Sequence, residues 1–315
     1  MMTSRSGRRL PFYVLDAFTD TPFAGNPAGV FLNADGLTDE TMKRLAAELS
    51  LESAFVFKPD ADGSHDLRLR YFTATTEVPL CGHATVSALV ALAHAGRVST
   101  PPARLRVATN AGVLAADLTA PGPEVTLFQA PPRFGLPLGA DEMAEVAAAL
   151  GMAPGEIAAT GLPAQRVSTG SPFLFVPVAT RGAVDRAPAD LAAIARLSRA
   201  HESLGVYVFR VESNEGEDRA APVSTWGRCF APVAGLDEDP VTGSASGALG
   251  CFLVRHGVLP PAPGGTATFT ARQGFAGGRG GSVHVSVETD ERGEIRSVAV
   301  TGSALLVAEG EFVVP

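Results

Sequence analysis

Residues 77–96, EVPLCGHATVSALVALAHAG, share a pattern with residues 238–257, EDPVTGSASGALGCFLVRHG. Both stretches begin with E-x-P-x-x-G-x-A and reach a glycine, Gly96 or Gly257, at the same distance. The segment between is nearly apolar on all sides but too short to span a bilayer, so it predicts a helix that is buried all round. The closing glycine predicts a left-handed residue after each helix.

Much of the remaining chain consists of short runs that predict strands. Apolar and polar residues alternate in LRLRYF (67–72) and SVHVSVE (282–288), as in half-buried strands. The final run, ALLVAEGEFVVP (304–315), predicts a hairpin of two short strands. A buried helix among many strands predicts an α+β fold of two pseudo-symmetric domains, each a curled sheet around a central helix.

Three further helices are predicted outside the repeat. Thr38 is a suitable N-cap for a helix with apolar residues along one face. The stretch ADEMAEVAAALG predicts a helix that begins at an Asp141 cap and stops at Gly151. The third helix is predicted in PADLAAIARLSRA (188–200), which has apolar residues at helical spacing, including Leu191 and Leu197.

The composition argues against several partners and locations. The chain has 315 residues and a formal net charge of -8, and its basic residues are spread out, so no nucleic-acid partner is expected. No run reaches the roughly 18 apolar residues of a membrane span, so no membrane partner is expected. Residues 1–10 lack the apolar core of a secretory signal. These features predict a cytoplasmic protein.

The cysteines and glycine-rich segments indicate neither a structural metal site nor a nucleotide site. Cys81, Cys229 and Cys251 are odd in number and form no CxxC pair, and the six histidines are scattered. We therefore expect no disulfide framework and no structural zinc site. The run GGRGG (277–281) lies among predicted strands and no Walker-type lysine is present, so no nucleotide site is predicted.

Each repeated glycine turn is suited to binding an anion. The first N–H groups of a helix have no partner within it and lie at the positive end of its dipole. Gly82 and Gly243 carry no side chain, so a carboxylate could approach these groups closely. Two such turns facing each other across a cleft would stabilise the charge left when a proton leaves carbon. Alternatively, the turns only start the helices, and His83 and Ser244 cap them.

Five segments carry a resemblance to a known family. They are DAFTDTPFAGNPAGVFL from Asp16, LAAELSLESAFVF from Leu45, RYFTATTEVPLCGHAT from Arg70, FAPVAGLDEDPVTGSASGAL from Phe230 and RQGFAGGRGGSV from Arg272. Together they resemble the phenazine-biosynthesis-type isomerases (PhzF-like proteins), which are similar in fold to diaminopimelate epimerase and proline racemase. The resemblance implies two barrel-like domains, each around a central helix, with the active site between them. It also implies a homodimer.

The domain boundaries are predicted from the chain length and from an interruption of the strand pattern. A chain of this length is typical of two domains, and TAPGPE (119–124) interrupts the strand pattern with prolines and a glycine. We expect an N-terminal domain over residues 1–122 and a C-terminal domain over residues 123–302. In the resembling family the last strand returns to the first domain, which implies that residues 303–315 belong to it.

The resemblance implies a catalytic role for Glu52, which lies in LSLESAFVF between a predicted helix and a predicted strand. A carboxyl group in a closed, mostly apolar cleft has a raised pKa and can take up and return a proton near neutral pH. Asp239 and His83 match the family's second carboxylate and its histidine contact. The other residues implied to contact or brace the substrate are Gly82, Gly243, Ser244, Asn26 and Gln273.

Cys81 and Thr242 hold equivalent places in the two repeats and support an alternative. Epimerases and racemases of this fold carry a cysteine in each half, whereas related hydroxyproline dehydratases pair a cysteine with a threonine. Cys81 can also be a small buried thiol, as Cys229 and Cys251 are predicted to be. Where the family often has proline after Gly-Arg this chain has glycine, so Arg279 is assigned no role.

The sequence therefore predicts an isomerase that needs neither cofactor nor metal and moves a proton on a small cyclic or amino-acid-like carboxylate. Glu52 would carry the proton, while Asp239 and His83 would contact the heteroatoms of the substrate. A second interpretation is a dehydratase or epimerase of a proline-like substrate that uses Cys81 and Thr242. A third is a non-catalytic protein that binds small carboxylates.

Overall fold

The computed structural model describes residues 7–98, 103–119, 124–187, 189–212 and 223–314. The chain divides into two compact units: unit 1 is Met1–Leu127 with Gly302–Pro315, and unit 2 is Phe128–Thr301. Most of the predicted junction at residues 119–124 lies outside the described residues, so the predicted domain boundaries stay predictions. No helix among the described residues is both long and apolar enough to cross a membrane.

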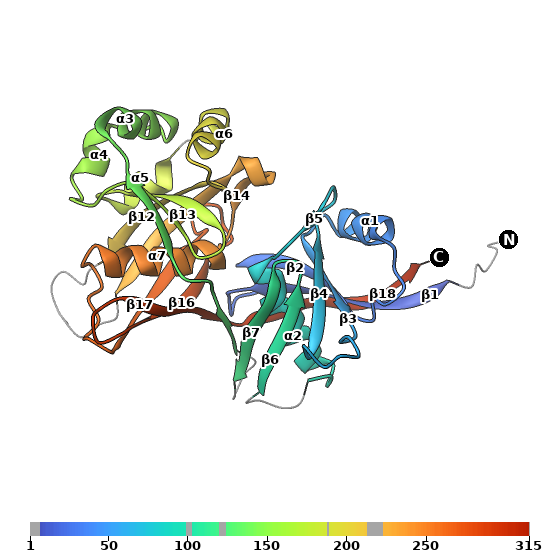
Figure 1. Ribbon diagram of the computed structural model, residues 1–315. Helices are drawn as coiled ribbons and strands as arrows, with labels where there is room; N and C mark the ends of the chain where they lie inside the picture. The colour runs from blue at the N-terminus through green and yellow to red at the C-terminus, as the bar shows by residue number, and fades with distance from the viewer. Residues whose placement is uncertain (1–6, 99–102, 120–123, 188, 213–222, 315) are drawn as a thin grey trace. The chain divides into compact units, whose positions relative to one another are not determined.

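Unit 1 is a curled sheet with helix α2 (Gly82–His94) inside its curve and helix α1 (Asp39–Leu49) on its outer face (Figure 1). Its strands are β1 (Arg8–Ala17), β2 (Asn26–Phe31), β3 (Ser53–Phe57), β4 (Leu67–Phe72), β5 (Glu77–Val78), β6 (Ala103–Thr109), β7 (Gly112–Thr119), β18 (Ala304–Val314) and most of β8 (Glu124–Phe128). Strand β1 pairs antiparallel with β2 and β18, and the sheet continues through β3, β4, β6 and β7.

Helix α2 is buried on every side, as its sequence predicts. All ten residues from His83 to Leu92 are buried, and the helix packs against β1, β2, β3 and β18. The Thr85 hydroxyl has two partners inside the fold, because it donates to the Cys81 carbonyl at 2.7 Å and lies 2.7 Å from the Tyr71 hydroxyl. The closing residue, Gly96, has the predicted left-handed conformation with φ 66°.

Unit 2 repeats the arrangement of a sheet around a buried helix and adds a layer of helices. Its strands are β9 (Arg133–Pro137), β10 (Gln165–Ser168), β11 (Pro172–Pro177), β12 (Val206–Glu212), β13 (Ser224–Ala231), β14 (Leu236–Asp239), β15 (Thr266–Gln273), β16 (Gly281–Thr289) and β17 (Ile295–Gly302). Its helices are α3 (Ala140–Ala149), α4 (Pro154–Ala158), α5 (Arg181–Arg186), α6 (Leu191–Ala200), the short 3-10 helix Pro232–Ala234 and α7 (Gly243–Arg255).

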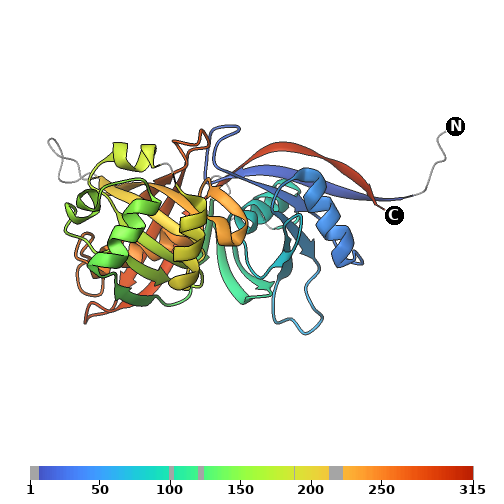
Figure 2. The same cartoon turned by 90° about the horizontal axis from the view of Figure 1, so that it is seen from above.

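The period of two in β12 explains why this sheet is covered on both faces. Val206 and Val208 belong to a buried cluster with residues of α3, α4, α5 and α6. Phe209, on the alternate face, packs edge-on against Phe252 of α7, with 5.6 Å between ring centroids. Figures 1 and 2 show these four helices gathered on one side of unit 2. Alternate side chains of one strand thus serve two apolar layers.

A pair of equivalent ion pairs fixes the start of each repeat. The Arg70 guanidinium donates to both carboxylate oxygens of Glu77 at 2.7 Å. The Arg228 guanidinium donates to both oxygens of Glu238 at 2.9 and 2.8 Å. Two-point contacts of this kind fix orientation as well as distance. The first glutamate of the repeated motif therefore anchors the strand that precedes each buried helix.

The helix ends match the predictions with one exception. Thr38 caps α1 by accepting a hydrogen bond from Thr41 N at 3.2 Å, and α6 spans the predicted third helix. The Asp141 cap is wrong, because α3 starts at Ala140 and its N-cap is Gly139. The Glu142 carboxylate accepts a hydrogen bond from Gly139 N at 2.8 Å, so a side chain inside the first turn replaces the missing cap side chain.

The predicted C-terminal hairpin is also wrong. Residues 304–314 form the single strand β18, which pairs with β1 from Arg8↔Val314 to Ala17↔Ala304. Gly310, which lies within this run, is directly opposite Phe12. A Cβ atom at this glycine would lie 2.9 Å from the Phe12 ring, so glycine here makes room for an aromatic neighbour rather than reversing the chain.

Replacing Gly250 by Ala should lower the free energy of unfolding by about 1–3 kcal/mol, because α7 packs tightly on its sheet. The added Cβ would lie 2.9 Å from Val285 and 3.0 Å from Val287. Gly155→Ala is the matched control, since its Cβ would meet no atom within 4 Å. That change should raise stability by about 0.5–1 kcal/mol through helix propensity. Urea unfolding of both variants tests the pair, and shifts of the same sign would contradict the packing argument.

Candidate functional site

Glu52 lies in the tight connection between α1 and β3. Ser50 ends the helix in a left-handed conformation, and its N–H donates to the carbonyls of Ala46 and Ala47. The Glu52 carbonyl accepts a hydrogen bond from Gly29 N at 3.1 Å, which ties the connection to β2. An added Cβ at Gly29 would lie 2.5 Å from Ser53 Oγ, so the close approach that holds Glu52 in place requires glycine.

The Glu52 carboxylate meets two side chains from the start of α2. The Cys81 thiol donates to Glu52 Oε2 with a sulfur–oxygen distance of 3.4 Å. His83 Nε2 lies 3.5 Å from the same oxygen, and His83 Nδ1 lies 3.4 Å from the sulfur. Cys81 and His83 are buried, while 24% of the Glu52 side chain is exposed. A carboxylate, a thiol and an imidazole therefore form one contact cluster within unit 1.

The environment of the cluster alters the acidity of the carboxylate. Burial raises the pKa of Glu52 above its usual 4.5, and the hydrogen bond from Cys81 lowers the pKa by a smaller amount. Desolvation acts in this direction because it disfavours the charged form. A carboxyl group with a raised pKa is better matched to accepting and returning a proton near neutral pH.

The cluster also has the composition of a metal-ligand set. One ligand atom from each of Glu52, Cys81 and His83 lies within 4.8 Å of the other two. The family resemblance assigns all three residues to one site, but their spacing does not show that they touch, since Glu52 is 29 residues from Cys81. Residue spacing alone therefore does not predict that a thiol, an imidazole and a carboxylate are in contact here.

Unit 2 holds a second cluster, around Asp239. The Thr242 hydroxyl donates to Asp239 Oδ2 at 2.6 Å. The Gln273 amide donates to the Asp239 carbonyl at 2.6 Å and to Thr242 Oγ1 at 3.0 Å, and its oxygen accepts from Thr242 N at 3.0 Å. Gln273 is buried and thus joins the carboxylate-bearing strand to the first residues of α7. Its amide braces both neighbours.

The remaining predicted site residues lie at the ends of elements. Gly82 opens α2 and Gly243 opens α7, and Asn26 is buried as the first residue of β2. The N-cap residues are Cys81 and Thr242, and neither accepts a side-chain capping bond. His83 and Ser244 lie inside the first helical turns rather than at the N-cap position.

Sequence reasoning missed Gln129, which supports the first turn of α7. Its amide donates to the Gly243 carbonyl at 3.1 Å, and its oxygen accepts from the Thr169 hydroxyl at 2.6 Å. A Cβ at Gly247 would lie 2.1 Å from Gln129 Oε1, so only glycine at this position leaves room for the Gln129 side chain. The only signal in the sequence is Gly247, one of two glycines that the second repeat has and the first lacks.

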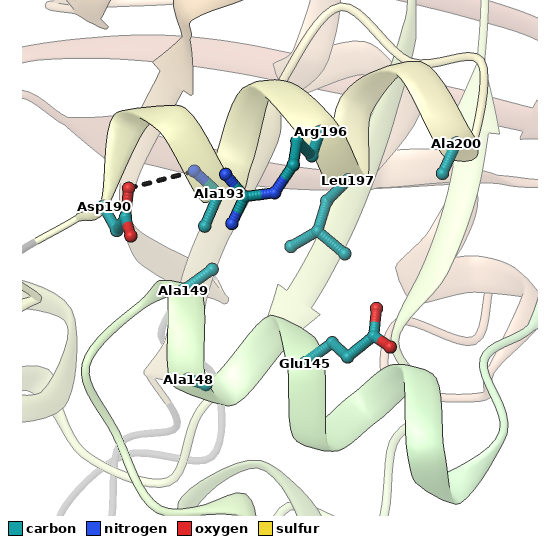
Figure 3. Close-up of a pocket in the computed structure, with 8 residues that line it drawn as sticks. All are labelled: Glu145, Ala148, Ala149, Asp190, Ala193, Arg196, Leu197 and Ala200. Carbon is teal, nitrogen blue, oxygen red and sulfur yellow. Dashed lines mark hydrogen bonds between the residues drawn. The ribbon is translucent and has the colours of Figure 1, made fainter.

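A cavity of about 540 Å³ lies elsewhere in unit 2, between α3 and α6. Figure 3 shows its lining, which is Glu145, Ala148, Ala149, Asp190, Ala193, Arg196, Leu197 and Ala200. Asp190 accepts a hydrogen bond from Ala193 N at 2.9 Å and so caps α6. The charged side chains of this cavity are exposed, and mostly small apolar residues surround them. The Glu52 cluster is therefore the better candidate for acid–base catalysis.

The three cysteines are buried thiols. Burial raises the pKa of the Cys229 thiol well above its usual range, and it raises the pKa of Cys251 to about 12. Both thiols are therefore inert core side chains, as predicted. The Cys81 sulfur contacts both the carboxylate of Glu52 and the imidazole of His83.

Comparison with known proteins places the chain among relatives that match most of its length. The model of the family described as phenazine biosynthesis-like protein matches residues 15–310. An uncharacterized isomerase of Clostridium acetobutylicum is 34% identical, over 97% of this chain and 99% of that one. The trans-2,3-dihydro-3-hydroxyanthranilate isomerase of Pseudomonas aeruginosa is 30% identical, over 95% of this chain and 98% of that one.

A solved structure supports the same assignment. The PhzF-family phenazine biosynthesis protein of Bacillus anthracis has a TM-score of 0.84 and 29% identity, and the match covers 98% of this chain and 100% of that one. The resemblance inferred from the sequence motifs and the predicted α+β fold are both confirmed.

Glu52→Gln should raise the free energy of unfolding at pH 7. Because the pKa of Glu52 is higher in the folded state, its stabilising contribution is complete below the unfolded value of 4.5 and is lost as pH rises through the folded value. The gain should be about 1.4 kcal/mol for each pH unit between the two values and should vanish near pH 4. Urea unfolding across this range measures it. Glu48→Gln, at an exposed position of α1, should change stability by less than about 0.5 kcal/mol.

Gln273→Met should destabilise unit 2 while preserving side-chain volume. It leaves the Thr242 N–H and the Asp239 carbonyl without their amide partner, at a cost of about 1–3 kcal/mol for each buried group left unpaired. Chemical denaturation measures the loss. A change below about 0.5 kcal/mol would contradict the bracing role.

Proposed function

The chain belongs to the phenazine biosynthesis-like protein family and is an isomerase, and from this premise we propose that Glu52 moves a proton between two positions of a small carboxylate substrate. The observation that supports the proposal is the placement of its carboxylate, 3.4 Å from the Cys81 sulfur and 3.5 Å from His83 Nε2. A half-buried carboxyl group beside a thiol and an imidazole, both of which can carry a proton, has the composition of a general acid–base site.

The proposed reaction proceeds in two proton transfers. The Glu52 carboxylate first removes a proton from a carbon of the substrate, which leaves a delocalised anion. The resulting carboxylic acid then delivers a proton, either the one it removed or one exchanged with solvent, to a different carbon, so a double bond moves and Glu52 is regenerated. No atom is gained or lost overall. The first N–H groups of α2 would stabilise the negative charge of the intermediate, because they lie at the positive end of the helix dipole.

His83 and Asp239 are proposed to contact heteroatoms of the substrate. The His83 imidazole can donate or accept a hydrogen bond according to its tautomer, and its contact with Glu52 places it beside the transferred proton. Asp239 Oδ2 accepts a hydrogen bond from the Thr242 hydroxyl at 2.6 Å, which orients the carboxylate for binding an amino or hydroxyl group. Asp239→Asn should therefore raise KM more than it lowers kcat.

The proposed substrate class is a cyclic amino-acid-like carboxylate. The Pseudomonas aeruginosa relative, with 30% identity, is named for activity on trans-2,3-dihydro-3-hydroxyanthranilate, a ring that carries carboxylate, amino and hydroxyl groups. A carboxylate suits a helix N-terminus that begins with glycine, and an added Cβ at Gly82 would meet no described atom within 4 Å. This compound is the first probe to use, and related cyclic amino acids follow.

The alternative that uses Cys81 and Thr242 is less well supported. The Thr242 hydroxyl is already committed to Asp239 and Gln273 at 2.6 and 3.0 Å. The Cys81 thiol donates to Glu52, so its effect on activity can come through that carboxylate. An active Cys81→Ala variant would exclude the alternative, whereas thiol alkylation that is blocked by bound substrate would favour it.

Glu52→Gln should lower turnover of the probe by at least about 100-fold, because a neutral amide cannot accept the proton. Binding of the probe should stay within about 3-fold of wild type, since size and hydrogen-bonding capacity are nearly preserved. The reaction is followed by nuclear magnetic resonance in deuterated water, which detects both isomerisation and label at carbon.

Glu48→Gln serves as the control, because it makes the same chemical change on an exposed face of α1. It should leave turnover unchanged. Turnover by Glu52→Gln at the wild-type rate would exclude Glu52 as the proton carrier. Binding of the probe by the wild-type chain without isomerisation or label would favour the carboxylate-binding interpretation for this compound.

A further inference from the structure

The contact cluster of Glu52, Cys81 and His83 has the geometry of a three-ligand metal site. We propose that these side chains bind a thiophilic divalent cation such as Zn²⁺, and that the bound ion reversibly blocks isomerisation. The binding part stands on the geometry alone. The blocking part rests on the proposed function of Glu52.

The distances within the cluster fit a tetrahedral ion. Zn²⁺ bonds of about 2.3 Å to sulfur and about 2.0–2.2 Å to nitrogen or oxygen place neighbouring ligand atoms about 3.3–3.6 Å apart. Here Cys81 Sγ is 3.4 Å from Glu52 Oε2, His83 Nε2 is 3.5 Å from that oxygen, and His83 Nε2 is 3.8 Å from the sulfur. These separations are close to those in a tetrahedral site, although the sulfur lies nearer to His83 Nδ1, at 3.4 Å, so the imidazole would turn to direct Nε2 at the ion.

The donor types select the kind of metal. Sulfur and imidazole nitrogen favour zinc and its softer neighbours over Mg²⁺ and Ca²⁺, which prefer oxygen ligands. A thiolate and a carboxylate together balance the two charges of the ion, which reduces the cost of placing it among buried groups. Three protein ligands leave the fourth tetrahedral position for water, as in zinc sites that are open to solvent.

The positions of the three ligands are fixed by the fold of unit 1. Cys81 and His83 flank Gly82 at the start of the buried helix α2, so they cannot move independently. Glu52 precedes β3, and its backbone is tied to β2 through Gly29. The ligands therefore come from a scaffold that does not need to form around the ion, which favours binding.

Metal binding would prevent Glu52 from carrying the catalytic proton. The hydrated ion gives up all but one of its waters, the Cys81 thiol releases its proton to solvent, and the carboxylate of Glu52 and the imidazole of His83 each donate an electron pair to the ion. A carboxylate bound in this way cannot accept a proton from carbon. A chelator removes the ion and restores the free carboxylate, so inhibition would be reversible and would not require oxidation of the thiol.

Co²⁺ is the probe for binding, because it enters the same tetrahedral sites as Zn²⁺ and absorbs light. Titration of the full-length chain should yield one equivalent of a species with visible absorption and a thiolate-to-cobalt charge-transfer band. Added Zn²⁺ should abolish both signals, since it binds nitrogen and sulfur sites more tightly than Co²⁺. Mg²⁺ should have no effect.

Variants assign the signal to the proposed ligands. Cys81→Ala should abolish the charge-transfer band and weaken binding by more than about 100-fold, a larger loss than for residues that only support a ligand. His83→Gln should also weaken binding strongly. Circular dichroism confirms that each variant is folded, and Cys81→Ser replaces Cys81→Ala if the latter does not fold.

Two controls match these variants. Cys251→Ala removes a buried thiol of α7 that is outside the cluster and should leave the band intact. His94 lies 3.3 Å from Glu309, which gives a histidine–carboxylate pair on the exposed surface of the same unit. His94→Asn should change Co²⁺ affinity by less than about 2-fold. A band that is missing in the wild type, survives Cys81→Ala or disappears in Cys251→Ala would overturn the metal site.

The same titration, read by turnover of the probe compound, separates this inference from the proposed function. Loss of turnover in step with the charge-transfer band, with recovery on chelation, supports both parts. A saturated metal site with full turnover supports the site but overturns the blocking effect and with it the role of Glu52. An inactive Glu52→Gln variant together with a wild type that binds no Co²⁺ overturns the metal site and leaves the proposed function standing.

Discussion

The fold of each unit depends on the burial of a helix that has no polar face. Helix α2 is buried along ten consecutive residues, and α7 likewise from Ala245 to Leu253. A single flat sheet covers only one side of a helix, so the strands must curl to remove the other sides from water. The curl in turn leaves the first turn of the helix as the place where polar groups can gather. The location of the polar site residues at the start of the helix is thus a consequence of how the helix is packed.

Two kinds of contact make that position specific in unit 1. The Arg70–Glu77 pair orients the chain as it enters α2, and the hydrogen bond from Gly29 to the Glu52 carbonyl sets the other side of the cluster. The three reactive side chains therefore take their positions from backbone that is held independently of any ligand. Unit 2 uses the same plan with Arg228 and Glu238, but an amide, Gln273, replaces the imidazole–thiol contacts.

The sequence predicted the features that depend on periodicity and missed those that depend on contacts. The buried helices, the strands with alternating residues and the cap at Thr38 all follow from local spacing. The predicted C-terminal hairpin and the predicted cap at Asp141 were wrong because the deciding partners, Phe12 and Glu142, lie in another strand or inside the helix. The role of Glu52 came from a family resemblance, and its contact with Cys81 spans 29 residues that no local pattern connects.

The pairing of β1 with β18 also affects how the chain is made. Strand β18 leaves the ribosome after the whole of unit 2, yet it lies beside the first strand of unit 1 from Arg8 to Ala17. Unit 2 is continuous in sequence and can complete its core during translation, whereas β1 keeps an unpaired edge until β18 has been synthesised. An unpaired β1 edge is a site for chaperone binding and for aggregation, and removal of β18 would destabilise unit 1 more than unit 2.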